Sequence, residues 1–178
     1  MKFKPKKSET AAELMSRLQS DPDWVRQNAE REAKRKAAAE KLEEELRPEE
    51  ALLLADLAAA GVKVESVWDL VNAKWPYPAA IPVLAAHLQR VRHPVLREGI
   101  GRALTVPEAR GAAARVILSE LQRPSGESPH SVRWVLANAL TLAGDDSIVD
   151  EIKALIADDR YTDVRERLTT AVEKIGSR

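Results

Sequence analysis

Apolar residues recur at helical spacing along most of this 178-residue chain, and in its C-terminal half they do so in three matching segments. Each segment carries apolar residues four and three positions apart, which places them on one face of a helix. The segments are Leu96-Arg97-x-x-Ile100-x-x-Ala103-Leu104, Val132-Arg133-x-x-Leu136-x-x-Ala139-Leu140 and Val164-Arg165-x-x-Leu168-x-x-Ala171-Val172. They align without gaps at intervals of 36 and 32 residues. The pattern predicts an internal repeat.

A second amphipathic segment precedes each repeated segment. It carries its own apolar pair four residues apart: Leu84 and Leu88, Ile117 and Leu121, and Ile152 and Ile156. One unit is therefore predicted to be two short helices joined by a turn. Because a single pair of helices cannot bury both apolar faces, the units are expected to stack on one another. Three such pairs cover about residues 79–176.

Turn-forming residues divide the region at matching places. Within the units they are His93-Pro94 and the stretches 124–129 and 158–162, and between units they are Pro107 and Gly144. Two of these turns hold paired carboxylates, Asp145 with Asp146 and Asp158 with Asp159. Each pair directly precedes a predicted helix, so we interpret these aspartates as helix caps rather than as an acid–base pair.

Helix-start signals also mark the N-terminal part of the chain. Thr10 and Glu13 have the spacing of a capping box, which predicts a helix over about Ala11–Gln19. Asp21 followed by Pro22 predicts the start of a second helix, because aspartate caps a helix and proline suits a first-turn position that needs no donor.

The second helix is expected to run to about Leu46. Its apolar positions are almost all alanine, so its burial would stabilise it far less than leucine would. Part of its stability should come from ion pairs one turn apart, such as Glu30 with Lys34 and Glu32 with Lys36. The sequence thus predicts a charged helical arm.

The pattern changes at Pro48. A leucine-rich stretch follows it, which we interpret as a separate short helix ended by Gly61, and Ser66 should start a further turn or two. We therefore expect two parts: residues 1–47 as a basic tail plus the helical arm, and residues 48–178 as a helical-repeat domain.

Composition narrows the class of protein. The chain holds 28 Lys and Arg against 28 Asp and Glu, which argues against a protein that chiefly coats nucleic acid or an anionic membrane. It has no cysteine, so disulfides and thiolate chemistry are excluded. The basic residues 1–7 are not followed by an apolar segment, and the longest uncharged stretch, 75–89, is too short and proline-rich to cross a membrane. A cytoplasmic protein with no membrane span is the expectation.

The residues of the repeats resemble a known family. The stretch Pro78-Ala79-Ala80-Ile81-Pro82-Val83-Leu84, the recurring Val-Arg-x-x-Leu-x-x-Ala-Leu and the segment Leu142-Ala143-Gly144 look like HEAT repeats, the helical-pair solenoids akin to armadillo. The chain is similar to small, uncharacterised bacterial HEAT-like proteins over a little more than half its length. The resemblance implies an all-α fold, a short right-handed α-α solenoid with a long charged N-terminal helix. HEAT modules chiefly bind other macromolecules.

One departure from the family pattern concerns an aspartate before the Val-Arg pair. It is present only as Asp163, whereas Val95 and Ser131 occupy the matching positions. A regular ladder of Asp-to-Arg contacts between repeats is therefore not implied.

A binding surface follows from the helical wheel of the second helix in each unit. If the repeated apolar residues are buried, three positions per helix lie nearly opposite them. These are Glu98, Arg102, Thr105, Trp134, Asn138, Thr141, Glu166, Thr170 and Glu173. The resemblance places the second helices on the concave face, so these nine residues are the expected partner-binding site.

Trp134 occupies a position where the pattern asks for an exposed residue, which makes it a candidate anchor. Alternatively, the neighbouring loop 124–129 or the N-terminal helix covers it. Arg97, Arg133 and Arg165 recur beside the apolar positions, and we expect them to bond to the adjacent unit or to a carbonyl.

Nothing in the sequence indicates catalysis. His87, His93 and His130 have neither ligand spacing nor cysteine partners, so no metal site, cofactor or catalytic residue is predicted. There is likewise no glycine-rich phosphate loop and no nucleophile elbow.

The leading hypothesis is a non-enzymatic protein–protein interaction module or scaffold that binds another protein on its concave face. The arm would either lie against the body or associate with itself or a partner. The alternative is a nucleic-acid-binding HEAT-like protein or DNA glycosylase-like enzyme, for which only Arg102, Trp134 and Glu166 qualify. A further alternative is a toxin-neutralising, immunity-type protein.

Overall fold

A computed structural model describes residues 10–124 and 129–178. The basic residues 1–7 and the centre of the loop 124–129 lie outside the described residues. The α-helices are α1 (Ala11–Gln19), α2 (Pro22–Ala59), α3 (Val67–Val71), α4 (Ile81–Arg90), α5 (Pro94–Ala103), α6 (Ala114–Leu121), α7 (His130–Ala143), α8 (Val149–Ala157) and α9 (Arg165–Gly176). Short 3-10 helices are η1 (Pro78–Ala80), η2 (Pro107–Ala109), η4 (Asp146–Ile148) and η5 (Asp159–Tyr161). The all-α expectation is confirmed for the described ranges, which contain no strand.

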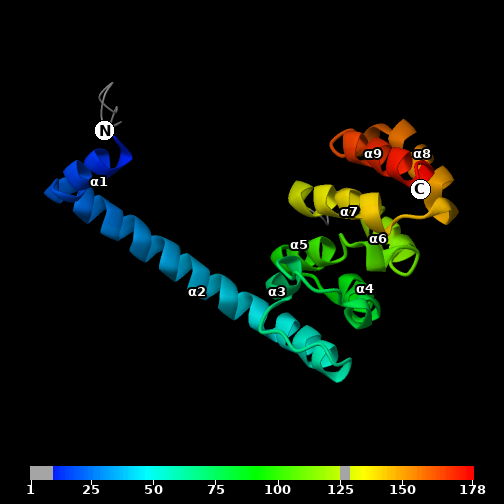
Figure 1. The fold of residues 1–178 in the computed structure, drawn as a ribbon, viewed down its shortest axis with the longest axis horizontal. Helices are drawn as coiled ribbons and strands as arrows, with labels where there is room; N and C mark the ends of the chain where they lie inside the picture. The colour runs from blue at the N-terminus through cyan, green and yellow to red at the C-terminus, as the bar shows by residue number, and fades with distance from the viewer. Residues whose placement is uncertain (1–9, 125–128) are drawn as a thin grey trace. The chain divides into compact units, whose positions relative to one another are not determined.

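None of the described helices combines the length and the apolar composition that a membrane span requires. The chain divides into two units, Met1–Glu45 and Leu46–Arg178. The boundary between them falls inside α2 (Figure 1).

The first unit contains α1 and the N-terminal part of α2. The predicted capping box is confirmed: Thr10 Oγ1 accepts from the Glu13 backbone N–H at 3.3 Å, and the Glu13 carboxylate accepts from the Thr10 backbone N–H at 2.9 Å. The Asp21 carboxylate in turn caps α2 by accepting from the Asp23 and Trp24 backbone N–H groups. Both helix starts therefore lie where the sequence placed them.

The predicted helix break at Pro48 is wrong, because α2 continues through it to Ala59. Proline inside a helix removes one hydrogen bond and crowds the preceding turn, at about 3 kcal/mol. Leu46 lies just before Pro48 and Leu53 just after it, and both are buried. We infer that their packing offsets the local penalty and keeps the helix continuous.

The ion pairs on the arm also differ from those expected. Lys36 Nζ lies 3.8 Å from the Glu40 carboxylate, and the Glu32 carboxylate instead accepts from the Asn28 side chain at 3.0 Å. Neither Glu30 nor Lys34 makes an ion pair with any residue that the structure describes. The partners changed because each residue can turn toward either neighbouring turn of an exposed helix.

The second unit contains the three predicted helix pairs, α4 with α5, α6 with α7, and α8 with α9 (Figure 1). Helix α7 packs against both α5 and α9, and α4 packs against α6. The repeated apolar position, occupied by Ile100, Leu136 and Leu168, is 0% exposed in all three pairs. Each such side chain stabilises the fold by about 1.5–3 kcal/mol relative to an exposed one. The core thus runs through successive pairs.

The predicted helix caps between these elements are confirmed. Asp145 Oδ1 accepts from the Ser147 backbone N–H at 3.0 Å, and Asp158 Oδ1 accepts from the Arg160 backbone N–H at 2.9 Å. His93 Nδ1 accepts from a backbone N–H at the start of α5 at 3.3 Å. The paired aspartates are therefore used at helix starts.

Candidate functional site

Eight of the nine residues predicted to bind a partner lie on α5, α7 and α9, and α7 packs against both of the other helices. Thr105, which was expected on the same helix as Glu98 and Arg102, lies just beyond the end of α5. A glycine permits the close approach of α5 and α7. A Cβ atom on Gly101 would lie 2.8 Å from Cγ1 of Val135, which is closer than real Cβ contacts allow. The absence of a side chain at Gly101 therefore helps to hold α5 against α7.

On α5, Glu98 and Arg102 pair with each other. The Arg102 guanidinium donates to the Glu98 carboxylate from Nε at 3.1 Å and from Nη2 at 2.8 Å. Thr105 is half-buried, and its hydroxyl donates to the Gly101 carbonyl at 3.0 Å. Arg102, the cation predicted for this part of the surface, is therefore already neutralised by Glu98.

On α7, Trp134 is half-buried rather than fully exposed. The guanidinium carbon of Arg167, from α9, lies 5.1 Å from the centre of the indole ring. This cation–π contact covers part of the ring and contributes about 0.5–1 kcal/mol. Sequence reasoning missed Arg167, because the helical wheel shows residues of one helix and not which residue of the next helix lies above them.

Asn138 lies one helical turn after Trp134, on the same face of α7. It is half-buried, and its carboxamide makes no hydrogen bond to any of the described residues. An amide has two donors and one acceptor, so this side chain retains its full capacity to bind a backbone or side-chain amide of a partner.

Thr141 requires a correction. It was expected on the exposed face, but it is only 6% exposed and its hydroxyl donates to the Asn138 carbonyl at 2.7 Å. The C-terminal Arg178 lies beside it and donates to the Thr141 carbonyl at 2.5 Å. Thr141 is therefore part of the packed interior at the end of α7 and cannot contact a partner directly.

On α9, Glu166 and Glu173 are exposed and Thr170 is half-buried. The Thr170 hydroxyl donates to the Glu166 backbone carbonyl at 3.0 Å. Neither carboxylate forms an ion pair with another described residue. This end of the surface is therefore negatively charged.

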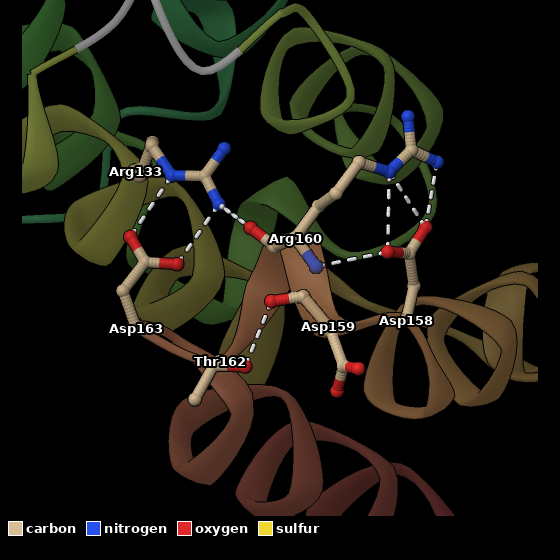
Figure 2. A network of polar contacts seen from close by, with 6 residues as sticks. All are labelled: Arg133, Asp158, Asp159, Arg160, Thr162 and Asp163. Atoms are coloured by element: carbon tan, nitrogen blue, oxygen red, sulfur yellow. Dashed lines mark hydrogen bonds and ion pairs between the residues drawn. The ribbon is translucent and has the colours of Figure 1, made fainter.

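Two of the three recurring arginines, Arg97 and Arg133, bond to the adjacent unit as expected. Figure 2 shows the Arg133 guanidinium facing the Asp163 carboxylate, with Nε and Nη2 donating at 3.0 and 2.9 Å. Nη2 also donates to the Arg160 carbonyl at 2.9 Å, and the guanidinium lies over the ring of Tyr161. These contacts join α7 to the turn before α9, and they use Asp163, the aspartate that precedes Val164 and Arg165.

The electrostatics of this contact favour the charged forms of both groups. The hydrogen bonds from Arg133 lower the pKa of Asp163 below its usual value, and the same bonds raise the pKa of Arg133. In the same turn, hydrogen bonds from the Arg160 side chain and backbone lower the pKa of Asp158. The turn before α9 is therefore held by ionised carboxylates.

Arg97, the first of the three arginines, finds a different partner. It is 4% exposed, and its Nη2 donates at 3.0 Å to Glu120 on α6, which is 2% exposed. The same carboxylate also pairs with Arg123 at 2.9 Å. Glu120 was not predicted, although it lies on the buried side of its helix, three residues after Ile117, where an acidic residue needs a partner.

Arg165, the last of the three, bonds within its own unit and not to a neighbouring one, which differs from the expectation. Its Nη2 donates to Asp159 at 3.1 Å, and its Nε is buried without a hydrogen-bond partner among the described residues. The three arginines thus share a helical position but bond to an acidic residue in three different ways.

The described residues do not gather three or more histidine and carboxylate side chains in a way that could hold a metal ion. His87, one of the candidates considered, is 5% exposed and its Nε2 lies 2.8 Å from Oδ2 of Asp56. That contact joins α4 to the C-terminal part of α2.

Comparison with protein-family models, with curated proteins and with solved structures found no match.

Proposed function

We propose that the unit Leu46–Arg178 is a HEAT-like solenoid that binds another protein through α5, α7 and α9. The order of helix contacts supports this architecture, because α5, α7 and α9 meet in sequence while α4 meets α6. In repeat proteins, each helix pair shares an apolar core with the next pair, and the stack therefore extends in one direction.

The observation that carries the proposal is the surface around Trp134. An indole ring held under Arg167 lies one turn from the Asn138 carboxamide, which has no partner in the described chain. Aromatic and arginine side chains dominate the binding energy of protein interfaces, and unused amide groups supply directional hydrogen bonds. An anchor beside unsatisfied polar groups is the pattern of a partner-binding surface.

The charges of this surface favour a protein over a nucleic acid. Glu98 neutralises Arg102, and the carboxylates of Glu166 and Glu173 have no cationic partner among the described residues. Phosphate groups would be repelled by these carboxylates, whereas a peptide with basic or amide groups would be attracted. The nucleic-acid alternative is tested by measuring DNA binding across salt concentration, and tight, salt-sensitive binding would favour it over the present proposal.

The test uses the full chain immobilised and exposed to extract from its own source cells. We expect the wild type to retain a defined protein that Trp134→Ala and Asn138→Ala each release. Lys153→Ala is the matched control, because Lys153 is exposed on α8, which carries none of the residues predicted to bind a partner. Unchanged far-ultraviolet circular dichroism would show that the variants are folded. Retention of the same protein by all four chains would contradict the proposal.

A further inference from the structure

The middle of α2 is exposed. Every residue from 29 to 41 is exposed, over three turns of the helix. Helices of globular proteins usually bury one face, and most helical stability comes from that burial. This segment would therefore gain stability from a partner that covers one of its faces.

The charges along this segment are divided by position. Residues 26–36 hold five basic against two acidic side chains, whereas residues 37–45 hold four acidic against one basic. The first half has a net charge of +3 and the second a net charge of −3. Because the division runs along the helix axis, it is present on every face.

The chain itself neutralises little of this charge. Lys36 lies 3.8 Å from Glu40 and Lys41 lies 3.7 Å from Glu45, and all four side chains are about half or more exposed. Such pairs contribute about 0–1 kcal/mol. Lys34, Arg35 and Glu44 form no hydrogen bond or ion pair within residues 10–124 and 129–178. Both halves therefore keep charge available for an outside partner.

We propose that residues 26–45 of α2 pair with the same residues of a second copy of the chain, in antiparallel orientation. Antiparallel pairing places the basic half of each copy beside the acidic half of the other, whereas parallel pairing would place like charges together. At 1.5 Å per residue the overlap is about 30 Å long. The alanines in it contribute little burial, so charge sets the orientation and the strength.

The occupant is a second copy because the complementary charge pattern is the chain's own. A helix carrying +3 followed by −3 is matched by itself turned end to end, which is the requirement of a two-fold symmetric interface. The inference goes beyond the proposed function, since it concerns α2 and not the surface around Trp134.

The experiment is sedimentation of the full chain at two salt concentrations. In about 0.01 M salt, where the Debye length is about 30 Å, we expect twice the 19.7 kDa mass of the chain. In about 1 M salt, where that length is about 3 Å, we expect the single-chain mass. A monomer at low salt would overturn the proposal.

Two charge-reversal variants sharpen the test. The acidic variant carries Arg31→Glu, Lys34→Glu and Arg35→Glu, and the basic variant carries Glu40→Lys, Glu43→Lys and Glu44→Lys. Each should sediment as a monomer by itself, because both halves of its segment now have the same sign. A mixture of the two should recover the dimer. Dimerisation of either variant alone would overturn the proposal, as would failure of the mixture to associate.

The antiparallel orientation is tested by disulfide cross-linking between introduced cysteines. The chain has no cysteine of its own that could compete. In an antiparallel pair of residues 26–45, which is centred between residues 35 and 36, Ala29 of one copy lies beside Leu42 of the other. Under oxidising conditions, Ala29→Cys mixed with Leu42→Cys should give a mixed disulfide, and Ala29→Cys alone should give little. Efficient cross-linking of Ala29→Cys to itself would indicate parallel pairing and overturn the proposal.

Discussion

Replacing Glu120 by leucine should destabilise the fold, because it removes the carboxylate that pairs with the buried guanidinium of Arg97. The Glu120 carboxylate accepts from Arg97 at 3.0 Å and from Arg123 at 2.9 Å. Arg123 is about one-third exposed and can return to water, but the Arg97 side chain is only 5% exposed and cannot. Its Nε already lacks a hydrogen-bond partner among the described residues. Without Glu120, the buried guanidinium would lose its only anionic partner among the described residues.

The expected size of the effect follows from that burial. Removing one member of a buried ion pair destabilises a protein by about 3–5 kcal/mol, whereas replacing both members by apolar residues is often neutral or stabilising. We therefore expect Glu120→Leu to lose about 3–5 kcal/mol and the double variant Arg97→Met with Glu120→Leu to recover most of it. The recovery separates the cost of an unpaired charge from a general loss of packing.

The assay is urea-induced unfolding followed by circular dichroism, for the wild type, each single variant and the double variant at neutral pH. The midpoints and slopes give the free energies of unfolding and the coupling between the two sites. A loss of less than about 1 kcal/mol in Glu120→Leu would refute the reasoning, because a loss that small is typical of an exposed pair. So would single-variant losses that simply add in the double variant.

Three further results are expected. Asp163→Asn should unfold more easily than the wild type at neutral pH, and the difference should shrink as pH falls below about 4. In the folded wild type, Arg133 lowers the pKa of the Asp163 carboxyl group, so this group stabilises the fold above its unfolded pKa and ceases to do so as pH falls through its folded pKa. A difference in stability between the two proteins that persists in acid would contradict this. Burial raises the pKa of Tyr77 to about 12, and its hydroxyl donates at 2.8 Å to a carbonyl at the end of α5. Tyr77→Phe should therefore lose about 1–2 kcal/mol in urea unfolding, and an unchanged midpoint would argue against the bond. Gly101→Ala should lower the melting temperature despite alanine's higher helix propensity, because its Cβ meets α7 at 2.8 Å, whereas Gly176→Ala, with open space around it, should not; equal melting temperatures would contradict the tight contact.

Local signals predicted most of the helix starts because the atoms involved are close in sequence. A hydroxyl or carboxylate that accepts from a backbone N–H two or three residues later needs no tertiary information, so the caps at Thr10, Asp21 and Asp145 could be read directly. The continuity of α2 through Pro48 could not, since we attribute it to the burial of leucines on both sides of the proline. Local propensity was overridden by packing.

The candidate site was predicted in part for the same reason. Periodicity placed Trp134 and Asn138 on one face of a helix, but it could not show that Arg167 of another helix covers the indole ring. Nor could it show that Thr141 is enclosed at the end of α7. The pairing of Glu120 with Arg97 could have been predicted from the sequence. An acidic residue on the apolar face of a helix needs a cationic partner, and Arg97 was already identified as one of the recurring arginines.

Two arginine–carboxylate contacts join successive helix pairs, and the carboxylate lies at a different place in each. The helix pairs are therefore not interchangeable. Arg97 meets its anion on the first helix of the following pair, whereas Arg133 meets Asp163 in the turn before the second helix of the following pair. The position that matches Glu120 in the last pair is Leu155, which is buried and apolar. Shuffling or duplicating these modules would misalign one cation with its counter-ion, so engineering by transplantation must carry each arginine together with its acid.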